Sequence, residues 1–515
     1  MFNKSERTQN VLKSTVTGEI YSVVNLLLGF TYRSIFLHFL TVEYLGINGL
    51  FTQLLNLLGM ADLGITNAIV FRFYRPIQED DYVQVGKLMN FFKHVYRIIF
   101  CVIMGVGLSM LPFIKILIKD SSEIPADVNI YVAFFLYLFQ TASSYMFAYR
   151  QTLLVADQRK YIVTGAQTVI TIIRYTIQIV TLAITHDYIL TLVANIITNV
   201  GGNYLISLYA VRKYKAVFAV TEKITTAETK DIMKDTTACL SHKVGSVVLR
   251  STDAIILSQF EGLMAVGLYS NYSLIINNLQ TLISQMLSNT TASLGNVNVS
   301  MDKEGQYRVY KNLNFVNLWI VASITICLYT LVDPFITLWI GRKMLLDEFT
   351  VILLCMQFYL ELSRQTNMSF TSASGLFVKD VIRPYIEAGL NLVTSIIAVQ
   401  YWGIAGVFIG TIVSCLLTVT WREPYLLFKY IFMRSMASYW TQFISFALLT
   451  IAICTVARTI VAGIIGSFIS WILCGVLVFL ATQLVFIILF WKSEERKYLF
   501  NLVFNLSKKI IKKRG

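Results

Sequence analysis

Long uninterrupted apolar runs constrain the fold of this chain more than any other feature of its sequence. A transmembrane helix needs roughly 20 consecutive apolar residues, and 56% of the 515 residues are hydrophobic. Charged residues make up only 14%, against roughly 25% in a soluble domain. The runs do not alternate as the strands of an outer-membrane barrel do. We therefore expect an all-α polytopic membrane protein, and we exclude a soluble enzyme, a coiled coil, a disordered chain and a disulfide-stapled secreted domain.

We expect about 14 transmembrane helices, one for each apolar run. The predicted spans are residues 19–40, 44–71, 94–114, 128–149, 161–184, 187–211, 236–259, 263–294, 312–332, 346–375, 382–400, 403–421, 438–460 and 466–491. The polar N-terminal segment has no cleavage site after a short apolar core, so it is not a signal peptide.

The basic residues predict the orientation of these spans. Thirty-two Lys and Arg residues fall in the termini and connections on one side, and five fall in the connections on the other side. Because cytoplasmic loops carry the excess of Lys and Arg, we expect both termini in the cytoplasm. The net charge of +14 is then a topology signal. We expect the basic tail at 508–514 to lie on anionic lipid, with no nucleic acid as partner.

The cysteines and histidines point to no metal site. Seven cysteines lie within or beside apolar runs without any Cys-x-x-Cys, and four histidines are scattered. We interpret the cysteines as small core residues and expect no metal and no other cofactor.

The two halves of the chain repeat each other at a nearly constant offset. The matched segments are Leu45-Gly46-Ile47 with Val266-Gly267-Leu268 at offset 221, Pro112-Phe113-Ile114 with Pro334-Phe335-Ile336 at 222, and Lys87-x-x-Asn90-Phe91 with Lys311-x-x-Asn314-Phe315 at 224. Chance similarity between apolar segments is the alternative. An offset near 222 maps the first span onto the seventh, and both begin on the cytoplasmic side. The repeat is therefore parallel, and it predicts two six-helix bundles with a substrate path between them.

This repeat also predicts the domain organisation. The expected parts are an N-terminal six-helix bundle at 1–211, a cytoplasmic linker at 212–235, a C-terminal six-helix bundle at 236–434, two extra transmembrane helices at 435–491 and a basic cytoplasmic tail at 492–515.

Four arginines lie inside predicted spans, where a charge that faces lipid costs roughly 2.5–3.5 kcal/mol on insertion scales. They are Arg33, Arg174, Arg250 and Arg364. Together they would cost on the order of 10–14 kcal/mol if they faced lipid, so we expect them to face a bundle interior or a wet cavity. Arg33 and Arg174 have no local acidic partner, which favours a cavity.

Two of the four arginines lie three residues from an acid, which places each pair on one helix face. The pairs are Arg250 with Asp253 and Glu361 with Arg364. Each pair either neutralises itself to permit membrane insertion or takes part in function.

Amide side chains also line predicted spans. They are Asn56 in the second span and Asn271, Asn278 and Gln285 on one face of the eighth. Such faces suit hydrogen bonds to sugar hydroxyls, and they equally suit helix packing in lipid. Together with the arginines, whose donor fork matches phosphate or carboxylate, they predict a cationic cavity for an anionic substrate.

Several segments resemble one family. They are Tyr44-Leu45-Gly46-Ile47-Asn48-Gly49-Leu50-Phe51, Ala61-Asp62-Leu63-Gly64, Tyr74-Arg75-Pro76-Ile77, Asp253-Ala254-Ile255-Ile256-Leu257 and Val266-Gly267-Leu268-Tyr269-Ser270-Asn271-Tyr272. The chain resembles the bacterial polysaccharide transporter family, the Wzx-like flippases of the multidrug/oligosaccharidyl-lipid/polysaccharide exporter superfamily. The resemblance covers most of the chain. At position 62 the family more often has Glu than Asp.

The resemblance implies a flippase and not an enzyme. It would move undecaprenyl-pyrophosphate-linked oligosaccharide, the repeat unit of a surface polysaccharide such as O-antigen, across the bacterial inner membrane by alternating access. Arg33 would meet the pyrophosphate or acidic sugars, and Asp253 would support the cavity or the coupling. Expected partners are the lipid-linked oligosaccharide, membrane lipids, and polysaccharide polymerase and assembly proteins.

The energy source stays open, because a unit charge that crosses 100 mV is worth about 2.3 kcal/mol. The membrane potential alone could drive an anionic head outward, and coupling to H⁺ or Na⁺ is the alternative. The candidate coupling or cavity-support residues are Glu19, Asp62, Asp253 and Glu361.

Two other functions remain as alternatives. A small-molecule or drug exporter on the same architecture would have an acidic and aromatic lumen. A membrane-embedded transferase would need a catalytic cluster and usually a large outer loop, but the longest outward loop covers only residues 115–127.

Overall fold

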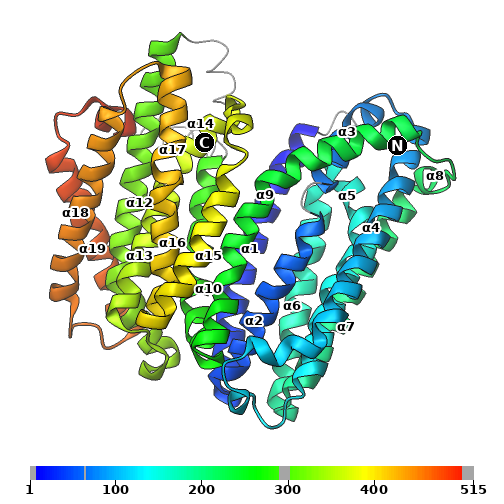
Figure 1. The fold of residues 1–515 in the computed structure, drawn as a ribbon, viewed down its shortest axis with the longest axis horizontal. Helices are drawn as coiled ribbons and strands as arrows, with labels where there is room; N and C mark the ends of the chain where they lie inside the picture. Colours follow the sequence, from blue (N-terminus) through cyan, green and yellow to red (C-terminus); the bar gives the residue numbers. More distant parts are fainter. Residues whose placement is uncertain (1–6, 63–64, 289–301, 501–515) are drawn as a thin grey trace, which may run out of the picture. The chain divides into compact units, whose positions relative to one another are not determined.

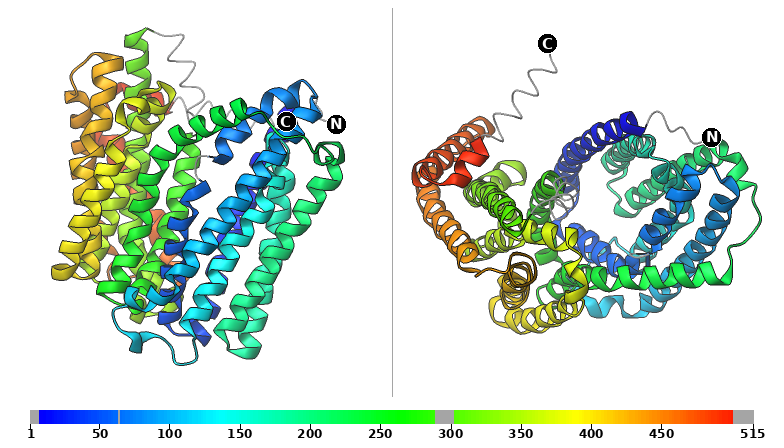
Figure 2. Two further views of the ribbon diagram at one scale, coloured as in Figure 1. Left: turned by 45° about the vertical axis from the view of Figure 1, so that its right-hand side comes forward. Right: turned by 90° about the horizontal axis from the view of Figure 1, so that it is seen from above.

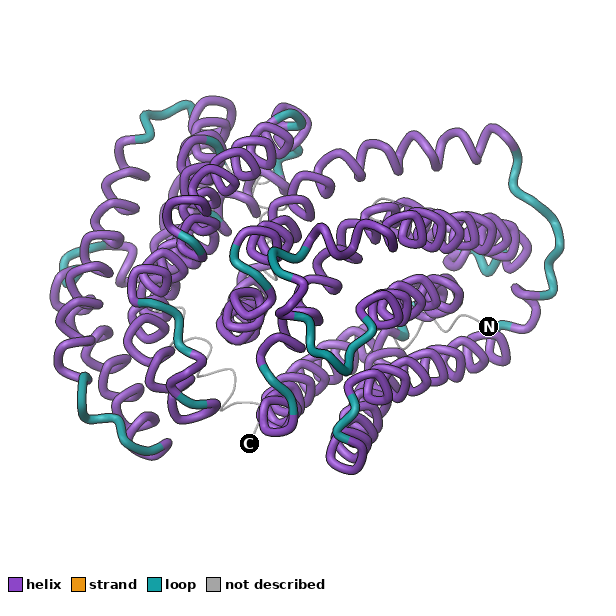
Figure 3. Tube along the Cα trace, turned by 60° about the horizontal axis from the view of Figure 1, so that its bottom comes forward, coloured by secondary structure: helices purple, strands orange, loops and turns teal. Residues whose placement is uncertain are grey.

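The computed structural model describes residues 7–62, 65–288 and 302–500. Within these ranges it does not describe the side chains of residues 7–8, 11–12, 61–62, 65, 67–68, 234–246, 248–250, 286–288 and 377–378. All regular secondary structure in the described ranges is helical, as Figure 3 shows. The all-α class predicted from the sequence is confirmed.

The chain divides into two compact units, residues 1–267 (unit 1) and 268–515 (unit 2). The helices of unit 1 are α1 (Arg7–Phe39), α2 (Val42–Leu58), η1 (Gly59–Asp62), α3 (Ile65–Gln78), α4 (Tyr82–Met110), η2 (Leu111–Leu117), η3 (Ser121–Glu123), α5 (Ile130–Ala156), α6 (Lys160–Thr185), α7 (Tyr188–Lys213), α8 (Lys215–Phe218) and α9 (Thr226–Phe260) (Figure 1). The next helix, α10 (Leu263–Ser288), begins in unit 1 and continues in unit 2.

Unit 2 contains the rest of α10 and all later elements. They are α12 (Lys303–Ile340), η4 (Arg342–Met344), α13 (Glu348–Ser363), α14 (Gln365–Ala373), η5 (Leu376–Asp380), α15 (Arg383–Trp402), α16 (Ile404–Leu417), α17 (Val419–Leu427), the π-helix η6 (Phe428–Phe432), α18 (Ala437–Val461) and α19 (Phe468–Leu489).

The boundary between the compact units differs from the domain boundary predicted at 212–235. It follows Gly267, so that α9, expected as the first helix of the second bundle, packs on α2 and α3 in unit 1. The five-part division derived from the repeat stays a prediction.

Nine helices of the described ranges are long and apolar enough to cross a membrane. The predicted spans at 161–184 and 438–460 lie within one residue of α6 and α18 at both ends. The single span predicted at 44–71 is wrong as a continuous helix, because α2 ends at Leu58 and α3 begins at Ile65. Glycine and aspartate, which disfavour helix interiors, lie in this break at Gly59 and Asp62. The total of 14 spans stays a prediction.

Polar side chains cap many of the apolar helices at their N-termini. Each capping carboxylate or amide oxygen accepts a hydrogen bond from a backbone N–H of the first turn, and the caps include Asp81, Asn129, Asp187, Asp302 and Asp347. Such caps satisfy donors that the helix itself leaves without a partner. They therefore fix where α4, α5, α7, α12 and α13 begin.

Two glycines make a reciprocal contact where α2 and the first turn of α10 meet. A Cβ added to Gly46 would lie 2.0 Å from the carbonyl oxygen of Leu263, and a Cβ added to Gly267 would lie 2.3 Å from the carbonyl oxygen of Val42. The offset of 221 that matches Gly46 with Gly267 also matches Val42 with Leu263. Each contact is therefore the repeat image of the other, as a two-fold relation between the matched segments requires. This geometry supports a two-fold repeat.

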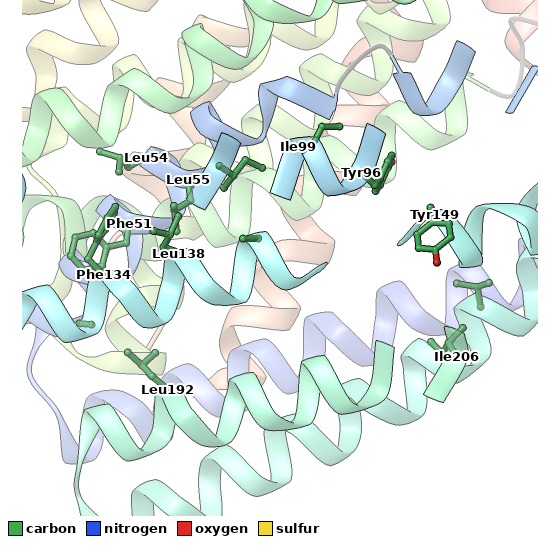
Figure 4. Close-up of a cluster of buried hydrophobic side chains, with 14 of the residues drawn as sticks. Phe51, Leu54, Leu55, Tyr96, Ile99, Phe134, Leu138, Tyr149, Leu192 and Ile206 are labelled. Carbon is green, nitrogen blue, oxygen red and sulfur yellow. The ribbon is translucent and has the colours of Figure 1, made fainter. Parts of the chain in front are cut away.

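The core of unit 1 is apolar and well packed around α5. Phe51 and Phe134 meet edge to face with ring centroids 5.2 Å apart, and Leu55 and Leu138 are buried beside them (Figure 4). Leu138 also fills the space over Gly107 of α4, where a Cβ would come within 2.3 Å of the leucine methyl group. These contacts hold α2, α4 and α5 together.

In unit 2, α12 is the central helix, and polar side chains join α19 to it. Figure 1 and Figure 2 show α12 beside α18 and α19. Trp319 Nε1 donates a 2.7 Å hydrogen bond to Gln483 Oε1, and Gln483 Nε2 donates a 3.0 Å bond to Ser323 Oγ. Because few competing partners exist in lipid, such bonds fix which helix packs where.

Polar contacts also join α18 to α12. Asn314 Nδ2 donates to Gln442 Oε1 at 3.1 Å, and Arg458 Nη2 lies 3.2 Å from Asp333 Oδ2. These contacts hold α18 against α12 near both ends of α18, as the hydrogen bonds of Gln483 hold α19 against the same helix.

Candidate functional site

Two of the predicted substrate-binding arginines lie on neighbouring helices of unit 1. Arg33 belongs to α1 and Arg174 to α6, and these helices pack side by side. Each arginine is adjacent in sequence to a tyrosine, Tyr32 or Tyr175. The centroids of these two rings are 5.5 Å apart. The packing of α1 on α6 therefore brings both arginines to one group of aromatic side chains.

The two guanidinium groups lie close to these tyrosines. Arg174 Cζ lies 4.7 Å from the centroid of the Tyr175 ring. Arg33 lies near Tyr32, Tyr137 and Tyr175, and Tyr32 lies near both arginines. A cation over an aromatic face gains roughly 0.5–2 kcal/mol, which offsets part of the cost of leaving water. We call these five residues the arginine–tyrosine cluster.

An asparagine of α2 fixes the orientation of the cluster. The hydroxyl groups of Tyr137 and Tyr188 each donate a 2.5 Å hydrogen bond to Asn48 Oδ1. Tyr188 also meets Tyr44 edge to face at 5.2 Å, and the Tyr44 hydroxyl donates to Asp127 Oδ1 at 2.5 Å. Tyr137, the member of the cluster that comes from α5, is thus held in place by Asn48 of α2, which also binds Tyr188 of α7.

Arg174 retains unused donor capacity. Its side chain is half-buried, as is that of Arg33. Its Nε is shielded from solvent and has no hydrogen-bond acceptor within the described part of the chain. No described carboxylate lies within 4.0 Å of its guanidinium group. A guanidinium fork in this state inside a membrane-spanning helix is suited to an anionic ligand with several oxygens, such as a phosphate.

An amide-rich contact between α5 and α7 was missed by the sequence analysis. Asn195 Nδ2 donates to Gln140 Oε1 at 3.1 Å, and Gln151 Nε2 donates to Asn203 Oδ1 at 2.9 Å. Asn203 Nδ2 also donates to the backbone oxygen of Asn199 at 2.9 Å. The three asparagines of α7 are four residues apart, and this spacing, which places them on one helix face, is the signal that could have found them.

Arg364, predicted to bind substrate, has an ion-pair partner on another helix of unit 2. Its Nη2 lies 2.5 Å from Glu423 Oε1, and its Nε donates to Glu423 Oε2 at 3.2 Å. Glu423 also lies 3.7 Å from Arg383. Glu361, which precedes Arg364 by one helical turn, accepts a 2.9 Å hydrogen bond from Gln280. Arg364 therefore pairs with Glu423 because α17 packs next to it. A role of Arg364 in substrate binding stays a prediction.

The other predicted site residues fall into three groups. Exposed on their helices are Glu19, Asn56 and Gln285. Buried or half-buried are Asp253, Asn271 and Asn278. The side chains outside the described residues are those of Asp62 and Arg250. The roles assigned to these residues stay predictions.

Charged contacts hold the connection that precedes α9. Thr225 and Glu228 form a reciprocal capping box, and the hydrogen bond from the Thr225 backbone N–H lowers the pKa of Glu228. Lys87, near the start of α4, lies 2.7 Å from Glu222. The segment predicted as a linker is thereby tied to the start of α4.

Comparisons with known proteins give matches of fold alone. No protein-family model and no curated protein matches the chain. Among solved structures, the lipid II flippase MurJ in an inward closed conformation matches with a TM-score of 0.66 and 15% identity, over 92% of this chain and 98% of that one. An inward-facing multidrug resistance MATE family transporter of the MOP superfamily matches with a TM-score of 0.56 and 14% identity, over 83% and 95%.

The Vibrio cholerae MATE transporter VcmN matches with a TM-score of 0.50 and 11% identity, over 84% of this chain and 99% of that one. By name, the first of these proteins is a flippase and the other two are transporters. The chain therefore has the all-α polytopic membrane fold that these transporters share.

Proposed function

We propose that this chain is a Wzx-like flippase, which moves undecaprenyl-pyrophosphate-linked oligosaccharide from the cytoplasmic to the outer leaflet of the bacterial inner membrane. The observation that carries the proposal is the arginine–tyrosine cluster, in which two half-buried cations lie on membrane-spanning helices. The fold of a lipid flippase supports it. The family resemblance of the sequence motifs supports the choice of an oligosaccharide as cargo.

In this proposal the cluster receives the pyrophosphate. Arg174 offers donors that no described acceptor uses, and Arg33 adds a second fork that matches phosphate oxygens. The tyrosine hydroxyls and the amides of α5 and α7 are donors and acceptors for sugar hydroxyls. The polyprenyl tail stays in the bilayer while the two halves of the repeat open alternately to each side.

The membrane potential can supply the energy in this scheme. A head of charge about −2 that moves outward from a negative interior gains roughly 4.6 kcal/mol per 100 mV. H⁺ or Na⁺ coupling through Glu19, Asp62, Asp253 or Glu361 remains an alternative. We also propose that both termini face the cytoplasm, as the distribution of basic residues predicts.

The second candidate is a small-molecule or drug exporter. The fold similarity to a multidrug resistance transporter and the aromatic rings of the cluster favour it. A hydrophobic cation would stack on such rings, but Arg33 and Arg174 would repel it. We therefore prefer the anionic lipid-linked cargo.

The test is complementation of a strain that lacks the gene. We expect lipid-linked oligosaccharide to accumulate on the cytoplasmic side of the deletion strain. The wild-type gene should clear it, whereas Arg33→Ala and Arg174→Ala should not, at equal protein level. The matched control is Arg75→Ala, which removes an exposed arginine of α3 that pairs with Glu79 just beyond the helix. This variant should clear the intermediate.

Two results would contradict the proposal. Normal glycan export by both cluster variants would remove the cationic site from the mechanism. A deletion strain without trapped intermediate, but with altered tolerance to small toxic compounds, would establish the exporter instead.

A further inference from the structure

The connection between α17 and α18 borders an open hollow on the surface of unit 2. The chain leaves α17 through the π-helix at Phe428–Phe432, and Met433 then takes a left-handed conformation with φ of 51°. Single π-helical turns often occur at functional sites. The hollow has a volume of about 470 Å³, and Tyr425, Lys429, Arg434 and Ser435 are among its lining residues. The irregular backbone thus brings two cations and two hydroxyl groups around one space.

Aromatic rings, more than carboxylates, hold the cations of this region. Lys429 Nζ donates to the Tyr425 hydroxyl at 2.8 Å and lies 5.6 Å from the centroid of the Tyr430 ring. Lys379 Nζ lies 3.6 Å from the same centroid. Within the described residues, neither ammonium group has a carboxylate within 4.0 Å. Their positive charge is therefore available to a ligand.

Arg434 has one acidic partner and one aromatic partner. It forms an ion pair with Glu304, and its Cζ lies 4.6 Å from the centroid of the Tyr307 ring. Both partners belong to α12, so the side chain of Arg434 is held by the central helix of unit 2. A guanidinium group that pairs with a carboxylate through one nitrogen still carries N–H donors on its other nitrogens.

The hollow lies where membrane spans end. Its lining residues run from the last turns of the apolar span Ile404–Phe432 to Met436, directly before the span Ala437–Val461. Lys303, at the start of the span Lys303–Ile340, contacts the Met433 sulfur at 3.0 Å. Trp421, Tyr430 and Met433 are exposed there. Exposed aromatic side chains next to basic ones are typical of the level of lipid headgroups.

We propose that this hollow binds the headgroup of an anionic phospholipid of the cytoplasmic leaflet. Lys429 and Arg434 contact the phosphate oxygens, and Tyr425 and Ser435 bond the remaining headgroup oxygens. The acyl chains leave past the exposed side chains of Trp421 and Met433. Basic pockets between membrane helices on this side bind anionic headgroups in this way. The assignment to the cytoplasmic leaflet rests on the proposed orientation, whereas headgroup binding itself does not depend on the flippase function.

The test uses the purified full-length protein in neutral detergent, titrated with fluorescent phosphatidylglycerol. Each cation near a lipid surface contributes about fivefold to affinity. We therefore expect Lys429→Gln to weaken binding about fivefold. The Lys429→Gln/Arg434→Gln variant should weaken it further, by at most about 25-fold, because Glu304 already offsets part of the Arg434 charge. The matched control is Lys213→Gln, which removes another lysine that lies over tyrosine rings, 5.7 Å from that of Tyr209, and it should bind as the wild type does. Unchanged thermal unfolding would show that the variants fold.

Three results would overturn the proposal. The first is unchanged affinity of the double variant, and the second is equally tight binding of fluorescent phosphatidylcholine. The third is complete displacement of the lipid by a millimolar excess of inorganic phosphate, which would assign the hollow to a free phosphate.

Discussion

A single added methyl group at Gly46 should loosen the contact between α2 and the first turn of α10. The new Cβ would lie 2.0 Å from the carbonyl oxygen of Leu263 and 2.7 Å from its carbonyl carbon. These are backbone atoms, so no side-chain rotation can relieve the overlap. Overpacking costs typically 1–3 kcal/mol, and an overlap this close belongs at the upper end.

The net effect also includes the helix propensity of alanine. Alanine stabilises a helix interior by about 1 kcal/mol relative to glycine, so we expect Gly46→Ala to destabilise the protein by about 2 kcal/mol net. For a unit of roughly 250 residues, this lowers the melting temperature by about 4–8 °C. Thermal unfolding of the purified protein in detergent, followed by tryptophan fluorescence, measures the shift.

The control substitutions should act in the opposite direction. Gly105 and Gly201 are exposed on α4 and α7, and no atom outside their own helices lies within 4 Å of an added Cβ. Gly105→Ala and Gly201→Ala should therefore raise the melting temperature by about 2–4 °C. If Gly46→Ala behaves like these controls, the close approach to Leu263 is wrong.

The reciprocity of the contact adds a second measurement. Gly267→Ala should lower the melting temperature as much as Gly46→Ala does, because the two contacts are images of each other. One small separation of the helices relieves both overlaps, so the double variant should lose less than the sum of the single losses. A clear inequality between the single variants, or strict additivity, would refute the two-fold relation.

Three further predictions address other contacts. Glu423→Gln should destabilise unit 2 by about 3–5 kcal/mol, since it removes the ion-pair partner of the largely buried Arg364. Arg364→Gln should cost less, because Arg383 remains 3.7 Å from Glu423, and thermal unfolding of the double variant should show less than the sum of both losses. The pKa of Glu228 is lowered in the folded protein. Its capping contribution is therefore present above the usual Glu pKa of about 4.3 and is lost as the pH falls through and below that value. Amide-exchange protection at the start of α9 should fall over this pH range in the wild type and not in Glu228→Gln. Asn48→Ala removes the acceptor of two tyrosine hydroxyls, at roughly 1–3 kcal/mol each, so its melting temperature should fall well below that of the exposed control Asn56→Ala.

The sequence predicted helices best where an apolar run coincides with one helix. Residues 161–184 and 438–460 are such runs, and α6 and α18 extend at most one residue beyond them. The prediction of one helix at 44–71 failed because hydropathy measures only how apolar a segment is. It does not take into account that glycine and aspartate disfavour a helical backbone. The break between α2 and α3 is therefore a local propensity effect inside an apolar segment.

The candidate site was predictable only in its charged members. Arg33 and Arg174 stood out because a charge inside a span needs a physical reason. Their tyrosine partners are neutral and common in membrane helices, so no single-sequence pattern marked them. Glu423 was missed as the partner of Arg364 because 59 residues separate them and only the packing of α17 brings them together.

The polar contacts of α12 have a consequence for the order of synthesis. Gln483 follows Trp319 by 164 residues, and Arg458 follows Asp333 by 125. At a translation rate of roughly 5–20 residues per second, Trp319 leaves the ribosome roughly 8–33 s before its partner exists. Thus α12, the most buried helix of unit 2, enters the bilayer before α18 and α19, and its hydrogen bonds to them form only after those two helices have been synthesised. A chain truncated before α18 would leave these polar groups exposed to lipid. In that state it would be accessible to the cell's membrane proteases.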